Sequence, residues 1–338
     1  MGVRGGDAVS QALGGLVLGI DAGNTKTIAL IADTSGAVLG WGRAGRSNIY
    51  VQRARALAAL QTAVAQARAS AGVDDRPFAA LTLSAAGADW PEDFDVLAAE
   101  LRRWNWARQL AVVNDAVGAL RAGSLAGLGV TVVCGTSAGI AARSPGGAVW
   151  HTSYWQEPEG ATQLAEHALR AVYRAELGID PPTTLTAPVL AFFGVPDVKA
   201  LLHSFTRRGR RPVPHLGRLA RVLLDQADAG DATSLRIVRG HGASLGDYAL
   251  AAARKVGLSG DYLLTTSGGV MRHQSPILRD ALLTRVREQH GDIRWQASHH
   301  EPVFGAVLLA LEAAGVTVDG AVFRRLEDTC PDEALFLT

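Results

Sequence analysis

A short polar turn between two apolar segments constrains the fold of this chain most. The turn Gly19–Thr27 reads Gly-Ile-Asp-Ala-Gly-Asn-Thr-Lys-Thr; Leu16–Leu18 precede it and Ile28–Ile31 follow it. Its carboxylate, amide, hydroxyl and ammonium groups suit the phosphates of a nucleotide, because N–H and O–H groups donate and Lys26 adds positive charge. It is not a Walker loop, since the G-x-x-x-x-G-K-[ST] spacing is absent and a strand follows instead of a helix. The sequence therefore predicts a β-hairpin that turns on phosphate-binding residues.

The overall composition is that of an ordinary globular protein. The chain has 338 residues, of which 48% are hydrophobic and 19% charged, with a formal net charge of +1. This length suits about two domains, and the charge argues against a dedicated nucleic-acid or membrane surface. Cys134 and Cys330 form no disulfide framework or metal-ligand spacing, so we expect a cytoplasmic protein. Residues 1–14 are expected to form a flexible extension.

The first half of the chain predicts the order β-β-β-α-β-α-β-α. Apolar runs bounded by turn residues indicate strands, and apolar residues at helical spacing indicate helices. The expected strands are Leu16–Ile20, Thr27–Ala32, Ala37–Gly42, Phe78–Leu83 and Gln109–Val113, and the expected helices are Val51–Ala71, Pro91–Leu101 and one from Ala116.

The second half partly repeats this order. A second polar turn, Gly135–Ala138, lies between two predicted strands, so each half begins with a similar hairpin. Two related α/β halves predict two lobes with a cleft between them. The remaining expected elements are strands Val130–Cys134, Gly139–Ala142, Tyr262–Thr265 and Ile293–Ala297, helices Gly160–Leu177, 184–256 and Val303–Ala313, a further helix before residue 293, and an irregular tail after Asp319.

Short motifs stand in order along the chain: Gly19–Thr27, Ser47-Asn48-Ile49, Asn114-Asp115, Cys134–Gly139, Ser267–Val270 and Pro302-x-x-Gly305-Ala306. Taken together, these motifs resemble the actin-like ATPase superfamily, which has a ribonuclease H-like fold. Within it, the chain is similar to the N-acetylglucosamine kinase and BadF/BadG/BcrA/BcrD-type ATPase group, over about residues 16–315. The resemblance implies an N-terminal lobe (15–120) onto which helix 302–315 packs back, a C-terminal lobe (121–301) with a helical insertion (184–256), and a tail (316–338).

The resemblance also implies a nucleotide site for ATP and Mg²⁺. Asp115 would be the catalytic base, and Asp21 would hold the metal through water; a helix cap and a turn-forming aspartate are the alternatives. The phosphate and adenosine contacts would come from glycines, hydroxyls, one amide and one ammonium. These residues are Gly23, Asn24, Thr25, Lys26 and Thr27 in the first motif, Gly135, Thr136 and Ser137 in the second, and Ser267, Gly268 and Gly269 in the adenosine motif.

The sugar side departs from the family pattern at one position. Pro158 stands where the N-acetylglucosamine kinases carry a sugar-binding aspartate, which leaves an amino sugar or a cell-wall sugar derivative equally open. Nearby aromatic residues are either a stacking surface for a pyranose or packing residues. Asn48 is either a sugar contact or the start of a helix. The candidate substrate residues are Asn48, Asn114, Trp155, Glu159 and Gly160.

The expected activity is that of an ATP-dependent sugar kinase, by resemblance acting on the 6-hydroxyl, in a homodimer without nucleic-acid or membrane partners. An ATPase activase with an iron–sulfur cluster is one alternative, although Cys134 and Cys330 suit cluster ligation poorly. A non-catalytic nucleotide-dependent regulator is another. His299-His300-Glu301 lacks further ligands at metal spacing, so surface residues are expected there.

Overall fold

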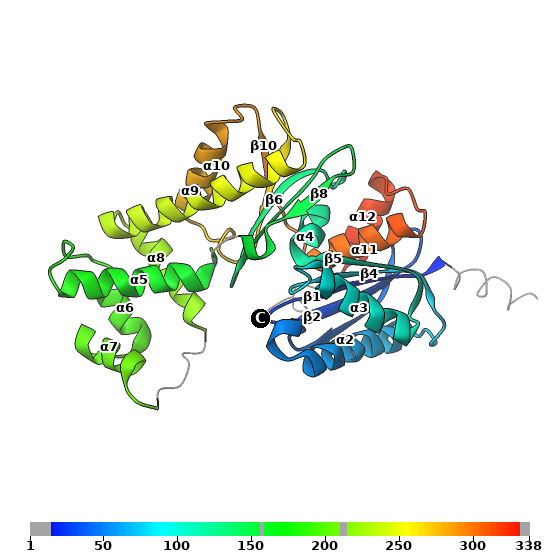
Figure 1. Cartoon of the computed structure of the whole chain (residues 1–338), viewed down its shortest axis with the longest axis horizontal. Coiled ribbons are helices and arrows are strands. Elements are labelled where there is room, and N and C mark those ends of the chain that lie inside the picture. Colours follow the sequence, from blue (N-terminus) through cyan, green and yellow to red (C-terminus); the bar gives the residue numbers. More distant parts are fainter. Residues whose placement is uncertain (1–14, 156–158, 210–214, 332–338) are drawn as a thin grey trace, which may run out of the picture.

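Two five-stranded sheets organise the molecule (Figure 1). The computed structural model describes residues 15–155, 159–209 and 215–331, so the predicted N-terminal extension, Pro158 and the last residues of the tail lie outside it. The first sheet has the order β3-β2-β1-β4-β5. Its strands are β1 (Val17–Ala22), β2 (Thr27–Ala32), β3 (Val38–Ala44), β4 (Phe78–Ala85) and β5 (Ala107–Asn114).

The second sheet repeats the first in both order and direction. Its order, β10-β9-β6-β7-β8, again has a strand flanked by an antiparallel neighbour and a parallel one. This match confirms the predicted duplicated α/β fold, with β1–β2 and β6–β7 as equivalent hairpins. The strands are β6 (Gly129–Cys134), β7 (Ala138–Arg143), β8 (Val149–His151), β9 (Leu263–Ser267) and β10 (Arg294–Ala297).

Helices cover both faces of the first sheet. One face packs on α2 (Ile49–Ala71) and α3 (Pro91–Trp104), and the other packs on α11 (Pro302–Ala313) and α12 (Gly320–Thr329). All six residues of β1 and of β2 are buried, as expected for strands covered on both faces. The helix α12 lies where the sequence predicted an irregular tail, so that prediction was wrong: Asp319 caps its N-terminus and Leu326 is fully buried.

The second sheet packs on a larger helical region. Its core joins β6, β7 and β9 to apolar residues of several helices, and α5 to α8 form one end of the molecule in Figure 1. Among the described residues no single helix has the length and apolar content to cross a membrane. The helices α6 and α7 reach that length and apolar content only when taken together, and a 50° bend separates them. The helices are α5 (Ala161–Glu176), α6 (Thr186–Phe193), α7 (Val198–Thr206), α8 (Leu219–Asp228), α9 (Ala232–Lys255) and α10 (Ile277–Arg287), with short 3-10 turns η2 (Ser153–Trp155) and η3 (Leu216–Arg218).

The helix α4 (Asp115–Ala122) links the two sheets and crosses α11 closely. A methyl group on Gly305 would overlap the backbone carbonyl of Gly118, so the backbones of the two helices touch without a side chain between them. A methyl group on Gly118 would in turn overlap the Ser84 hydroxyl. This crossing brings the N-termini of both helices to the same region of the molecule.

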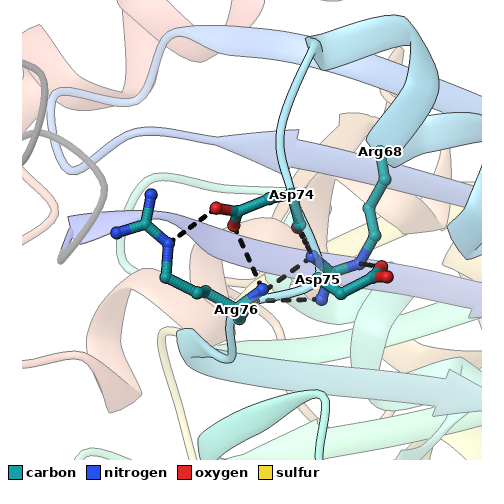
Figure 2. Close-up of polar contacts among 4 residues, drawn as sticks. All are labelled: Arg68, Asp74, Asp75 and Arg76. Carbon is teal, nitrogen blue, oxygen red and sulfur yellow. Dashed lines mark hydrogen bonds and ion pairs between the residues drawn. The ribbon is translucent and has the colours of Figure 1, made fainter.

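A buried arginine fixes the connection between α2 and β4. Arg68 donates to the backbone carbonyls of Asp74 and Arg76 (Figure 2). Its guanidinium also lies 4.3 Å from the centre of the Phe78 ring. The neighbouring pair Asp74–Arg76, 2.7 Å apart, closes the loop at the surface. The loop therefore has a structural role that leaves β4 in register beside β1.

Candidate active site

The predicted catalytic residue lies at the first position of α4. The cap of this helix is Asn114, whose side-chain oxygen accepts from the backbone N–H of Ala116 at 3.1 Å. The Asp115 carboxylate is therefore not the side chain that caps the helix. Burial raises the pKa of Asp115, with a partial offset from the backbone N–H groups of Asp115 and Ala116. A partly buried carboxylate with a raised pKa suits a general base.

Asp21 lies near Asp115, at the end of β1. Burial raises its pKa to about 8, the negative charges of Asp115 and Glu301 add to the shift, and Lys26 opposes it. In the described part of the chain, no group of three or more acidic, histidine or cysteine side chains could hold a metal ion. The Asp21 carboxylate is an oxygen donor of the kind that Mg²⁺ prefers, so it is the residue here that would hold such an ion.

The first turn presents part of its predicted residues to solvent. Asn24 and Thr25 are exposed, Gly23 and Lys26 are half-buried, and the N–H of Gly23 donates to the carbonyl of Lys26 at 2.9 Å. Thr27 is the exception: its side chain is fully buried, 2.6 Å from the carbonyl of Gly45 and 2.7 Å from the Ser47 hydroxyl. Thr27 therefore stabilises the hairpin from inside, where protein groups engage its hydroxyl, and its contact with phosphate stays a prediction.

Glu301 connects this turn to the other lobe. One carboxylate oxygen lies 3.4 Å from Lys26 Nζ, and the other lies 3.5 Å from Arg272 Nη1, three residues after Gly269. Glu301 caps α11 by position, so the helix places the carboxylate between the two cations. The expectation of surface histidines holds for His299, which is exposed, whereas His300 is half-buried and stacks on Phe304 at 4.2 Å.

The second turn carries no charged side chain, and the residues at the start of α5 hold its backbone. Thr136 and Ser137 are exposed, and Gly135 donates to the carbonyl of Ser137 at 2.9 Å. The backbone of Ala161, in the first turn of α5, donates to Gly135 at 2.9 Å. Gly160 is buried against this turn, where a methyl group would overlap the backbone of Ser137. Gly160 thus packs against the turn, and its contact with sugar stays a prediction.

The adenosine motif lies against the same strand end. Gly268 has a φ of 96°, and a methyl group there would overlap the carbonyl of Cys134 at the end of β6. Gly269 is exposed, and a methyl group on it would meet no other atom within 4 Å. Ser267 is buried, and its hydroxyl has no hydrogen-bond partner in the described structure. These features leave Ser267 and Gly269 as the candidates for contacts with a ligand.

Three of the predicted substrate residues differ in how far protein groups engage their side chains. Asn48 caps α2, accepts from Tyr50 N at 2.8 Å and donates to Asn24 at 2.8 Å, so it links the helix to the first turn. Trp155 is 69% exposed. Asn114 donates to the carbonyl of Ala88 at 3.1 Å and to the carboxylate of Asp89 at 2.9 Å. Its amide therefore positions neighbouring protein groups, which differs from the direct substrate contact that the resemblance implied.

The Glu159 side chain is held by two residues of α9. Its carboxylate accepts from Ser244 at 2.8 Å and lies 3.3 Å from His241 Nδ1, both on α9. His241 also contacts the backbone carbonyl of Glu159 through Nε2, at 2.6 Å. Burial lowers the pKa of His241, and the Glu159 carboxylate opposes that shift. Glu159 therefore links α9 to the segment beside the second turn, and its sugar contact stays a prediction.

Sequence reasoning missed Asp89, between β4 and α3. Burial raises its pKa to about 6, with a smaller contribution from the charge of Asp115. The strands β4 and β5 are parallel and paired as far as Ala85 and Asn114, so both end at the same edge of the sheet. An acidic residue just after the first of these strands was therefore the available signal for Asp89.

The cysteines offer nothing to a metal cluster. Cys134 is buried at the end of β6, donates to the carbonyl of Glu159 at 3.4 Å, and has its pKa raised to about 12 by burial. Cys330 is partly buried at the end of α12. The two thiols are therefore packing residues in different parts of the fold, which gives the activase alternative no support.

Comparison with known proteins identifies the family. A sequence model of the BadF/BadG/BcrA/BcrD ATPase family matches residues 18–310. The chain belongs to this family. Its curated relatives include the N-acetyl-D-glucosamine kinase of Dictyostelium discoideum, 24% identical over 88% of this chain and 98% of that protein. Another is the N-acetylmuramic acid/N-acetylglucosamine kinase of Clostridium acetobutylicum, 25% identical over 87% of this chain and 97% of that protein.

Solved structures share the fold of this BadF/BadG/BcrA/BcrD family member. A Chromobacterium violaceum structure, solved as a proposed N-acetylglucosamine kinase, has a TM-score of 0.66 at 23% identity and covers 88% of this chain and 99% of its own. A glucokinase of the ROK family from Streptomyces griseus, solved with glucose and AMPPNP, has a TM-score of 0.55 at 18% identity and covers 88% of this chain and 100% of its own. The predicted actin-like fold is thereby confirmed.

Proposed function

We propose that this chain is an ATP-dependent sugar kinase that transfers the γ-phosphoryl group of ATP to a hydroxyl of an amino sugar or related hexose. The observation that carries the proposal is the position of Asp115: a partly buried carboxylate at the start of α4, freed from capping by Asn114 and close to Asp21. Kinase names among both the curated relatives and the structural neighbours support the same reaction class.

In the proposed reaction, the acceptor hydroxyl attacks the γ-phosphorus while Asp115 accepts its proton. A bond forms between the acceptor oxygen and phosphorus, the bond from the γ-phosphorus to the bridging oxygen breaks, and ADP leaves. Asn24, Thr25, Lys26, Gly135, Thr136 and Ser137 are proposed to hold the phosphates from the two turns, and Ser267 and Gly269 to border the adenosine. Asp21 would hold Mg²⁺, which neutralises charge on the phosphates when bound.

The test is an ATP-coupled screen with amino sugars, anhydro-sugars and simple hexoses. Replacing Asp115 by Asn should reduce transfer by about 10²- to 10⁴-fold, because the proton acceptor is removed while the shape is kept. Binding of Mg·ATP, followed by calorimetry, should change little. Asp95→Asn, an exposed aspartate on α3, is the matched control.

Two outcomes would contradict the proposal. Transfer by Asp115→Asn at the wild-type rate would remove Asp115 as the base. Nucleotide binding without transfer to any sugar would favour the non-catalytic regulator. The 6-hydroxyl as the acceptor group, the homodimer and the cytoplasmic location stay predictions.

A further inference from the structure

An exposed aromatic surface lies beside Asp89. We call Tyr50, Trp90 and Tyr154 the aromatic wall; they come from α2, the residue before α3, and η2. Tyr154 contacts Tyr50 edge-on at 5.5 Å between ring centres and stacks with Trp90 at 6.2 Å and 24°. The three side chains stay 49%, 40% and 52% exposed. Aromatic rings that pack together yet keep this much exposed surface are suited to contact the apolar face of a ligand ring.

The hydroxyls of the wall are anchored on acidic groups. Tyr50 donates to Asp93 at 2.5 Å, and the Asp93 carboxylate also accepts from the backbone N–H of Trp90 at 2.8 Å. The Asp89 carboxylate interacts with the Tyr154 and Ser153 hydroxyls and accepts from Asn114 at 2.9 Å. The wall and Asp89 are therefore held in one arrangement by residues of both lobes.

The same region has an excess of negative charge. Asp89 lies near Asp93 and Asp115, and the electrostatic contributions to Asp89 come from these two carboxylates. Among the described residues, the charged groups that act on the Asp89 carboxylate are Asp115 and Asp93, with no lysine or arginine. Polar partners for Asp89 are neutral donors, which leave its charge uncompensated. A cationic group on the acceptor would supply the missing positive charge.

We infer that Asp89 and the aromatic wall select an acceptor sugar that carries a free, protonated amine. The sugar ring lies against the wall, and the ammonium pairs with the Asp89 carboxylate beside Asp115. Acylation of the amine removes the positive charge, and a carboxylate on the sugar would be repelled by Asp89 and Asp93. This inference rests on the proposed kinase function and narrows its substrate class to amino sugars with an unsubstituted amine.

The test compares kcat/KM for four acceptors at neutral pH: glucosamine, N-acetylglucosamine, glucose and N-acetylmuramic acid. Wild-type enzyme should prefer glucosamine to N-acetylglucosamine by about tenfold, the equivalent of one charged hydrogen bond, and should use the acidic sugar least. Asp89→Asn keeps an acceptor for Asn114 but removes the charge, so the preference should disappear. Asp95→Asn should keep the preference. An unchanged ratio in Asp89→Asn would overturn the inference, as would a wild-type preference for the N-acetylated sugar.

Calorimetry of glucosamine binding to the full chain separates this inference from the proposed function. If no sugar is phosphorylated but glucosamine binds and Asp89→Asn weakens that binding by about tenfold, the kinase proposal fails and the inference stands. If sugars are phosphorylated without a preference that depends on Asp89, the inference fails and the kinase proposal stands. Absence of both transfer and binding overturns both.

Discussion

The two hairpin turns each close on a glycine N–H but differ in length and in charge, with four residues between β1 and β2 and three between β6 and β7. Each begins with a glycine whose N–H donates at 2.9 Å to a carbonyl further along the turn. In the first hairpin, charged side chains flank the turn: Asp21 before it and Lys26 within it. In the second, Val133 stands at the position equivalent to Asp21, and the turn is shaped by Gly160 and the start of α5.

This difference indicates that a β-hairpin can be suited to an anion either by charged side chains or by packing. Charged groups in the first turn interact at a distance and respond to pH and ions. Contacts behind the second turn act only where atoms touch, and they respond to the size of a side chain. Substitutions in the first hairpin should therefore have effects that depend on pH and ions, and substitutions in the second should have effects that depend on side-chain size.

The largest expected effect is on the pH dependence of the unfolding free energy, which Asp21 should set in protein kept free of metal. Its pKa is raised from 3.8 to about 8, so the folded state holds a proton that the unfolded state has lost. The resulting stability is present below about pH 4 and is lost as the pH rises towards about 8, at up to about 1.4 kcal/mol per pH unit. Asp21→Asn should match the wild type in acid and exceed it at pH 8 in denaturant unfolding.

Magnesium ions with ATP should narrow that gap at pH 8, because a bound cation favours the ionised carboxylate of Asp21. A difference between wild type and Asp21→Asn that does not vary with pH would show that charge does not distinguish the first hairpin.

The next effect tests packing behind the second turn. Gly160→Ala inserts a methyl group into the backbone of Ser137, and it should cost about 1–3 kcal/mol of unfolding free energy. The affinity for Mg·ATP, measured by calorimetry, should fall with it. The matched control is Gly240→Ala on α9, where a methyl group meets no atom within 4 Å and the helix should become slightly more stable. Equal stability of the two variants would contradict the role of Gly160.

The smallest effect concerns Lys26. Lys26→Met keeps the apolar stem but removes the ammonium next to Glu301, and it should weaken Mg·ATP binding by about tenfold. Unfolding free energy should change little, because the ion pair with Glu301 is partly exposed. Lys199→Met, an exposed lysine on α7, is the control. A loss of affinity that persists at high salt would argue against a simple charge effect.

Local sequence patterns predicted the fold well. The turn residues at Gly19–Thr27 and Gly135–Ala138, and the apolar runs around them, determine hairpins that the structure contains. The tail was misjudged because the pattern of α12 is amphipathic and short. Half of its residues are exposed, and Leu326 gains its burial from contacts with distant parts of the chain.

The site was less predictable, because side-chain direction depends on tertiary contacts. A hydroxyl such as that of Thr27 has the same chemistry whether it faces a ligand or Gly45, and only the folded hairpin decides. Glu159 likewise turns towards α9, about 80 residues later in the chain. Asp89 and Glu301 carry no motif; they reach the site because β4 and α11 bring them there.

The close crossing of α4 and α11 has a mechanical consequence. The chain passes from the first sheet to the second through α4 and returns to the first through α11, and these two passages touch at Gly118 and Gly305. Any rotation of one sheet against the other must pivot at this point, within a few residues of Asp115 and Glu301. A single methyl group added at Gly118 or Gly305 would therefore change the angle between the two hairpins without contacting either of them.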